Sequence, residues 1–211
     1  MSLCFALLLD AGFLRYQLGK KDEPADAQDI EEFVAKVVAL KELSGMRLHR
    51  TYFYDSKPLD GSDVNPLDGS IVDFGASETA SHNRSLHAHV AKLPYVSMRF
   101  GELYQEGWGI KKNFFTRSKG KAGPLQLEAK HLKPIIRQKG VDMRIGLDIA
   151  SLTLKKHVQV IVLATADSDF IPAMKFARRE GAQLILVTLG KGVRDGMREH
   201  ADVVIDAFDS A

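Results

Sequence analysis

Short apolar runs alternate along this chain with segments whose apolar residues recur every three or four positions. Residues 3–9 and 158–164 are uninterrupted apolar runs, which is typical of strands buried on both faces of a parallel sheet. Shorter runs predict further strands at residues 48–54, 95–103, 184–189 and 203–205.

Helical spacing fills most of the chain between these runs. One helix is predicted over residues 30–40, where either Asp26 or Asp29 can cap its start and Gly45 can close it. Further helices are predicted over residues 80–92, 131–156 with an interruption near Gly140, 170–181 and 193–200. Strands that alternate with helices favour an α/β fold with a mainly parallel, doubly wound sheet.

Two stretches interrupt this alternation. Residues 55–79 are rich in Pro, Gly, Asp and Ser, and residues 104–124 combine glycine with basic side chains. Loops of this length inside a folded domain are usually functional or mobile. We therefore expect one domain over residues 1–211 with long loop insertions near 55–79 and 104–124.

Composition supports a folded protein in a reducing compartment. The chain has 211 residues, 45% of them hydrophobic, and its formal net charge of +2 gives no general attraction to nucleic acid or membrane. The single cysteine, Cys4, lies in an apolar run and is interpreted as a core residue. Because no signal peptide or membrane-spanning stretch is present, we expect a cytoplasmic protein with no membrane partner.

Carboxylates follow the two strongest predicted strands. Asp10 ends the first run, and Asp167 and Asp169 follow the run at 158–164. In open parallel sheets, ligands bind beyond the carboxyl ends of the strands, so these side chains can share one crevice. A different interpretation is that Ser168 or Asp169 only caps the helix that follows.

A cluster of carboxylates needs a cation or a shared proton to relieve its repulsion. Mg²⁺ or Mn²⁺ suits oxygen ligands and keeps waters for chemistry. Asp142 follows Gly140 at a predicted helix start and is a fourth candidate, although it can also be a plain first-turn carboxylate. Asp148 lies roughly 240° further around that helix and is a second-tier candidate, as are Thr165 and Ser168.

Three motifs in this order resemble a known family. They are Asp10 after an apolar strand, Lys-Gly-Val-Asp at 139–142 and Thr-Ala-Asp-Ser-Asp-Phe at 165–170, with Ala201-Asp202 near the last strand. Together they resemble the NYN domains, which include the LabA/DUF88 group and belong to the PIN-like nucleases. The likeness extends from Asp10 to Asp202.

The resemblance implies a three-layer α/β/α sandwich of the PIN-like, Rossmann-like kind. It also implies an acidic pocket that holds Mg²⁺ or Mn²⁺ for the hydrolysis of RNA. The implied catalytic and metal-binding residues are Asp10, Asp142, Asp167 and Asp169. One departure is Phe13, where many NYN domains have Asn. The loss of this polar side chain would affect the hydration of the pocket or the positioning of the substrate.

A basic and aromatic stretch at residues 111–121 is a candidate for RNA binding, since cations hold phosphates and aromatic rings stack on unpaired bases. The alternative is a solvated hairpin whose Phe side chains return to the core. Lys139, beside Asp142, is a second candidate phosphate contact or an ordinary surface lysine. The remaining candidate RNA-binding residues are Trp108, Lys111, Lys112, Arg117 and Lys119.

Other chemistries find less support. The spacing of His82, His87 and His89 fits no zinc-finger signature, and residues 190–196 lack the dinucleotide and P-loop fingerprints. The segment after Asp10 lacks the second Asp of haloacid-dehalogenase-type phosphatases. The leading hypothesis is an endoribonuclease acting on single-stranded or structured RNA. The alternative is a catalytically weak RNA-binding or regulatory module, and the sequence is compatible with a homo-oligomer.

Overall fold

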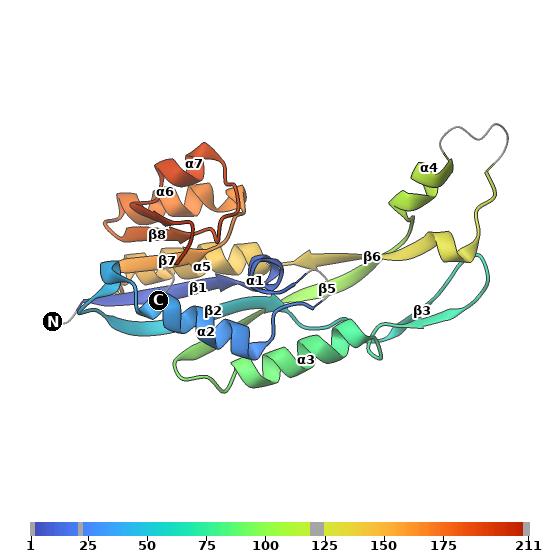
Figure 1. Ribbon diagram of the computed structural model, residues 1–211, viewed down its shortest axis with the longest axis horizontal. Coiled ribbons are helices and arrows are strands. Elements are labelled where there is room, and N and C mark those ends of the chain that lie inside the picture. The colour runs from blue at the N-terminus through green and yellow to red at the C-terminus, as the bar shows by residue number, and fades with distance from the viewer. Residues whose placement is uncertain (1–2, 21–22, 119–124, 209–211) are drawn as a thin grey trace.

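A seven-stranded sheet with helices on both faces forms the body of the protein (Figure 1). The structure is a computed structural model that describes residues 3–20, 23–118 and 125–208. The strands are β1 (Cys4–Asp10), β2 (Arg47–Ser56), β3 (Ser62–Val64), β4 (Ile71–Asp73), β5 (Val96–Ile110), β6 (Leu132–Lys139), β7 (Val160–Ala164), β8 (Gln183–Val187) and β9 (Val203–Ile205). The α-helices are α1 (Ala11–Leu18), α2 (Ala27–Val38), α3 (Glu78–Val90), α4 (Lys112–Ser118), α5 (Val141–Leu154), α6 (Ile171–Arg179) and α7 (Asp195–Glu199). Short 3-10 helices are η1 (Lys41–Leu43), η2 (Ala129–His131) and η3 (Ser168–Phe170).

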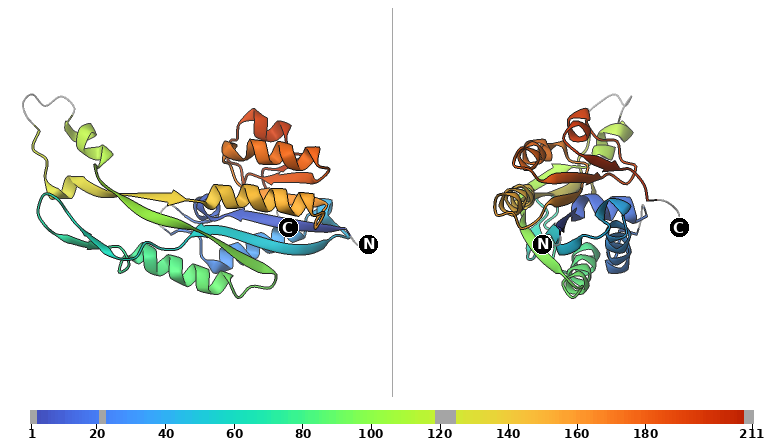
Figure 2. Two further views of the ribbon diagram at one scale, coloured as in Figure 1. Left: turned by 180° about the vertical axis from the view of Figure 1, so that it is seen from behind. Right: turned by 90° about the vertical axis from the view of Figure 1, so that its left-hand side faces the viewer.

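The sheet has the strand order β6-β5-β2-β1-β7-β8-β9, and every neighbouring pair except β5 and β6 is parallel. Helices α1, α2 and α3 cover one face, while α5, α6 and α7 cover the other (Figure 2). This arrangement confirms the predicted α/β fold with a mainly parallel central sheet flanked by helices. No helix in the described parts of the chain is long and apolar enough to cross a membrane.

Strand β1 lies at the centre of the sheet, and its apolar side chains pack against the helices on both faces. Phe5, Leu7 and Leu9 pack toward α1 and α2, whereas Ala6 and Leu8 pack toward α5. From β1 the chain goes first to β2 on one side and later to β7 on the other. The crevice between the carboxyl ends of β1 and β7 is therefore the topological switch point of the sheet.

The prediction of helix over residues 131–156 is wrong in its first half. Residues Leu132–Lys139 form strand β6, which pairs antiparallel with β5, and only Val141–Leu154 is helical. Pro134 is accommodated because β6 is an edge strand. Gly140, with φ of 81°, adopts the left-handed conformation that separates strand from helix.

The two predicted loop insertions also contain regular structure. Within 55–79, β3 and β4 form a hairpin, and within 104–124, β5 continues to Ile110 and is followed by α4. Together with β6 they build an arm that extends away from the body (Figure 2). The Asp63 carboxylate connects β3 to β5 within the arm. Its Oδ2 accepts hydrogen bonds from Trp108 Nε1 at 2.7 Å and from Gln105 Nε2 at 2.5 Å. Hydrogen bonds across strands, which leave no local signature, created structure where composition indicated loop.

Helix α2 uses both candidate caps. The Asp26 Oδ1 atom accepts hydrogen bonds from the backbone N–H groups of Gln28 and Asp29, and Asp29 Oδ2 accepts one from the backbone N–H of Asp26. This reciprocal arrangement satisfies backbone donors that the first turn leaves unpaired. The helix ends at Val38, and Gly45 instead provides a turn with φ of 76° before β2.

We expect Asp26→Ala to lower the free energy of unfolding by about 1 kcal/mol, because the helix loses its N-cap. Urea denaturation followed by circular dichroism measures this change. Glu31→Ala, on the exposed face of the same helix, is the control and is expected to change stability by less than about 0.5 kcal/mol. Equal losses in the two variants would contradict a specific capping role.

Candidate active site

A pocket of about 540 Å³ opens at the carboxyl ends of β1 and β7. It is bounded by the turns after these two strands and by the start of α5. Its lining residues are Asp10, Gly12, Phe13, Gln138, Val141, Asp142, Ala166, Asp167 and Ser168. Three of the four leading aspartates predicted from sequence therefore meet in one pocket at the switch point.

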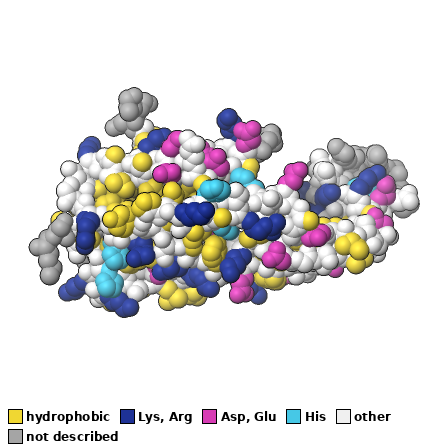
Figure 3. Space-filling view, turned by 90° about the horizontal axis from the view of Figure 1, so that it is seen from below, with side chains coloured by type: hydrophobic (Ala, Val, Ile, Leu, Met, Phe, Trp, Pro, Cys, Tyr) yellow, Lys and Arg dark blue, Asp and Glu magenta, His cyan; other side chains and the backbone are white. Residues whose placement is uncertain are grey.

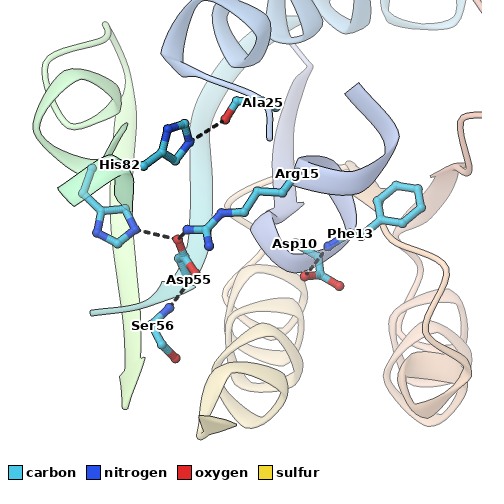
Figure 4. A network of polar contacts seen from close by, with 8 residues as sticks. Asp10, Phe13, Arg15, Ala25, Asp55, Ser56 and His82 are labelled. Carbon is cyan, nitrogen blue, oxygen red and sulfur yellow. Dashed lines mark hydrogen bonds and ion pairs between the residues drawn. The ribbon is translucent and has the colours of Figure 1, made fainter. Parts of the chain in front are cut away.

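Asp10 is held in place by hydrogen bonds to both of its carboxylate oxygens. Oδ1 accepts from the Phe13 backbone N–H at 3.3 Å (Figure 4) and so caps α1. Oδ2 accepts from Thr165 Oγ1 at 2.9 Å. Burial raises the pKa of Asp10, these hydrogen bonds oppose the rise, and the charge of Asp142 adds to it. Asp10 is thus a positioned carboxylate that binds a proton more tightly than usual.

The turn after β7 places Asp167 and Asp169 differently. Thr165 is fully buried, and its Oγ1 accepts a hydrogen bond from the Asp167 backbone N–H at 3.2 Å. Asp167 Oδ1 in turn accepts from the Asp169 backbone N–H at 2.9 Å and caps η3. Both side chains are exposed, but Asp167 caps a turn and lines the pocket, whereas Asp169 is not among the lining residues.

Asp142 lies in the first turn of α5 and faces the carboxylates of the β7 turn. Burial raises the pKa of Asp142, and the charges of Asp167 and Asp169 raise it further. Asp142 in turn contributes to the raised pKa of Asp10. The four aspartates form one electrostatic group, and the residues that line the pocket include no Lys or Arg to offset it.

Asp148 takes part in a separate contact. Its Oδ2 accepts hydrogen bonds from the Tyr54 hydroxyl and from Arg99 Nε, both at 2.9 Å, on the side of α5 that faces β2 and β5. Asp148 does not line the pocket. Its contacts make it part of the packing between α5 and the sheet.

The candidate RNA-binding residues lie on the arm and at its base. Trp108 is held by Asp63, and Lys111 Nζ donates to the Lys130 carbonyl oxygen at 2.8 Å. Phe114 is buried and packs against His131, whereas the side chain of Phe115 is 54% exposed. One aromatic ring thus returns to the protein interior and the other stays accessible.

The remaining candidates of this group are placed as follows. Lys112 and Arg117 lie in α4, and Lys119 lies outside the described residues. At the base of the arm, Lys139 Nζ lies 4.3 Å from the ring centroid of Tyr104. Lys139 is therefore held by a cation–π contact near the pocket.

One pocket residue and one buried polar cluster near the pocket were not predicted from the sequence. Gln138 lines the pocket from the end of β6, a strand that was predicted as helix. A buried cluster also lies under α1, where Asp55 Oδ2 accepts hydrogen bonds from Arg15 and from His87 Nε2, the latter at 2.5 Å (Figure 4). The signal for Asp55 was available, because it follows an apolar strand just as Asp10 does.

The three spaced histidines have separate hydrogen-bond partners. His82 contacts the Ala25 carbonyl oxygen, His87 contacts Asp55, and His89 contacts the Ser85 carbonyl oxygen. Across the described residues, no group of three His, Cys, Asp or Glu side chains is close enough to enclose a metal ion.

The pocket nevertheless suits a weakly enclosed Mg²⁺ or Mn²⁺ ion. Mg²⁺ keeps several waters and is usually bound through one or two carboxylates rather than by a full protein cage. Asp10, Asp142 and Asp167 supply oxygen ligands in a pocket whose lining has no cationic side chain. The raised pKa values of Asp10 and Asp142 are the response expected of carboxylates that share one pocket without a counter-ion.

Comparison with known proteins finds a family match to part of this chain. Residues 110–208 match the NYN domain. The match supports the NYN/PIN-like family and includes Asp142, Asp167 and Asp169, while Asp10 lies before it. An uncharacterized protein of Methanocaldococcus jannaschii, MJ0482, is 29% identical over 73 residues, which are 35% of this chain and 30% of that protein.

Solved structures show the fold alone. A protein of unknown function from Vibrio parahaemolyticus, VPA0982, superposes with a TM-score of 0.52 at 12% identity and covers 97% of this chain and 92% of its own. The nicotinamidase SaPncA of Staphylococcus aureus, with a TM-score of 0.31 at 12% identity over 95% of this chain and 89% of its own, is too distant to inform the site. The sequence match to the NYN domain therefore carries the family evidence.

We expect Mg²⁺ to raise the melting temperature at pH 7 by several degrees and to lose this effect as the pH falls. A carboxyl whose folded-state pKa is raised stabilises the fold below its ordinary pKa of 3.8, and this contribution is lost as the pH rises through the raised value. Mg²⁺ restores stability only where the carboxylates are ionised. At about ten times its Kd, an ion contributes about 1.4 kcal/mol.

Thermal melts in Mg²⁺ and in EDTA between pH 4 and 8 measure the difference, and NaCl of equal ionic strength is the control. The gap between the two curves should widen as the pH rises. A gap that is independent of pH, or one that NaCl reproduces, would count against a metal at these carboxylates.

Proposed function

We propose that this chain is a ribonuclease that uses Mg²⁺ or Mn²⁺ to hydrolyse RNA phosphodiester bonds. The observation that carries the proposal is the meeting of Asp10, Asp142 and Asp167 in one pocket, each from a different element. The match of residues 110–208 to the NYN domain supports it, and so does the resemblance of the three motifs to the LabA/DUF88 group. We further propose RNA as the substrate and the cytoplasm as the place of action.

Asp10, Asp142 and Asp167 would hold the ion, with Asp169 close behind them. The bound ion supplies Lewis acidity, which lowers the pKa of a coordinated water and offsets charge on the phosphate. Thr165 fixes Asp10 through its hydroxyl, so the carboxylate needs little rearrangement.

The RNA would approach along the base of the arm. Lys139 lies next to the pocket residues Gln138 and Asp142 in the chain and is suited to a phosphate contact. We retain Trp108, Lys111, Lys112 and Arg117 on the arm as secondary contacts, and also Lys119, which lies outside the described residues. Since the indole N–H of Trp108 is already bonded to Asp63, its ring can offer stacking but no free donor.

A second candidate function is a catalytically weak RNA-binding or regulatory module. Phe13 lines the pocket at a position where many NYN domains have Asn. An aromatic ring at this place removes a polar contact for water or substrate.

We expect Asp167→Asn to reduce Mn²⁺-dependent cleavage of RNA by at least about 100-fold, because the pocket loses a carboxylate while Asn still caps η3. Cleavage of a fluorescently labelled RNA in Mn²⁺ and in EDTA measures the effect. Glu31→Gln, which removes a carboxylate from the exposed face of α2, should leave the rate unchanged. Full activity in a correctly folded Asp167→Asn protein would disprove the assignment.

Phe13→Asn separates the two candidate functions. A restored polar contact worth about 1.5 kcal/mol in the transition state would raise kcat by about tenfold. Phe13→Leu, which keeps an apolar side chain, is the matched control. A tenfold gain over a slow wild type supports the weak module, whereas a fast wild type that Phe13→Asn leaves unchanged supports the ribonuclease as it stands.

A further inference from the structure

Two short basic runs lie side by side at the edge of the sheet opposite the acidic pocket. Arg47, His49 and Arg50 are at the start of β2, and Lys155, Lys156 and His157 link α5 to β7. The runs meet at His49 and His157, whose parallel imidazole rings have centroids 5.8 Å apart and an interplanar angle of 8°. We call this surface the amino-edge patch, because it lies at the amino ends of the parallel strands.

The positive charge of the patch is not neutralised within the described chain. Among residues 3–20, 23–118 and 125–208, the ion pairs involve other side chains, and no carboxylate pairs with the two arginines or the two lysines of the patch. These four side chains carry +4 in a chain whose formal net charge is +2, so all other residues together carry −2. On the face shown in Figure 3, Lys and Arg side chains lie beside His side chains at the end of the body away from the arm.

The positive charges of the patch affect the pKa of His49. Burial lowers the pKa of His49, and the charges of His157, Arg50 and Arg47 lower it further. Arg47 itself makes a weak contact of 3.7 Å from Nη2 to Cys4 Sγ. Cations that repel one another without a carboxylate partner are suited to bind an external anion.

An aromatic residue lies at the same edge. Tyr95 is 67% exposed and has φ of 61°, a left-handed conformation that is unusual for a non-glycine residue. Its carbonyl oxygen accepts a hydrogen bond of 2.9 Å from the backbone N–H of Thr51, the neighbour of Arg50. Tyr95 is therefore an accessible ring beside the basic run of β2, and a ring next to cations is the combination by which proteins hold unpaired nucleotides.

Helix α5 joins the patch to the acidic pocket. Asp142 is at its start, and Lys155 immediately follows its end. The helix has 14 residues and is therefore about 21 Å long. At about 3.4 Å per stacked nucleotide, this length corresponds to roughly six nucleotides.

We propose that the amino-edge patch binds single-stranded RNA and holds the part of the substrate about six nucleotides from the cleaved bond. Arg47, Arg50, Lys155 and Lys156 contact phosphates, and Tyr95 stacks on a base. The choice of RNA as the anion rests on the proposed function. The accessible ring favours a polynucleotide over an acidic peptide, which has no bases to stack.

The charge contribution is tested with the double variant Arg47→Gln, Arg50→Gln. Binding of a fluorescein-labelled oligouridylate of about 12 nucleotides is followed by anisotropy in EDTA, so that cleavage does not interfere. The slope of log affinity against log salt should fall in magnitude by about 1.4, which corresponds to two phosphate contacts on a single strand. The control Lys36→Gln, Lys41→Gln removes the same charge from exposed positions elsewhere and should leave the slope unchanged.

The stacking contribution is tested with Tyr95→Ala, which should weaken binding about 5- to 100-fold without changing the salt slope. Tyr95→Phe keeps the ring and should bind like the wild type. Equal effects of the patch and control double variants, or full affinity in both Arg47→Gln, Arg50→Gln and Tyr95→Ala, would overturn the proposal. Patch-dependent binding of polyglutamate as tight as that of RNA would overturn it as well.

This test is independent of the outcome for the acidic pocket. If the wild type cleaves no RNA but binds it through the patch, the proposed ribonuclease activity fails and the patch assignment stands. If the wild type cleaves RNA and the patch variants bind and cut a long and a short oligonucleotide like the wild type, the patch assignment fails alone. When both proposals hold, patch variants lose cleavage efficiency on oligonucleotides of about 12 residues and keep it on those of about four.

Discussion

The burial of β1 on both faces is the constraint on which the rest of this structure depends. Leu7, Leu8 and Leu9 have no exposed surface, because helices cover the central strand from both sides. The strand is buried up to its last residue, Asp10, which is partly exposed at the end of the sheet. Its two hydrogen bonds connect the end of β1 to α1 and to Thr165 after β7. The pocket is thus a direct product of core packing.

The pocket concentrates negative charge that the fold does not neutralise. Burial and mutual repulsion raise the pKa values of Asp10 and Asp142, which is unfavourable for the ionised protein. By contrast, the carboxylates that serve packing have partners: Asp148 is paired with Arg99, and Asp55 with Arg15. This difference separates side chains that stabilise the fold from those left available for an ion or a substrate.

Charge is also divided along the strands. Acidic side chains gather at the carboxyl ends of β1 and β7, while basic side chains gather at the amino ends of β2 and β7. Helix α5 runs between the two regions, with Asp142 at one end and Lys155 at the other. A small net charge therefore conceals two surfaces of opposite charge, which the overall composition does not reveal.

The sequence by itself determined the central strands, the helices between most of them and the identity of the acidic residues at the strand ends. Those features depend on local periodicity and on the position of a polar residue after an apolar run. Only the tertiary structure decided that 132–139 is a strand, because its pairing with β5 outweighs its local pattern. The direction of Asp148 toward Tyr54, and the meeting of His49 with His157, likewise depend on how distant segments pack. Contacts between residues far apart in the chain leave no periodic trace, so a single sequence could not reveal them.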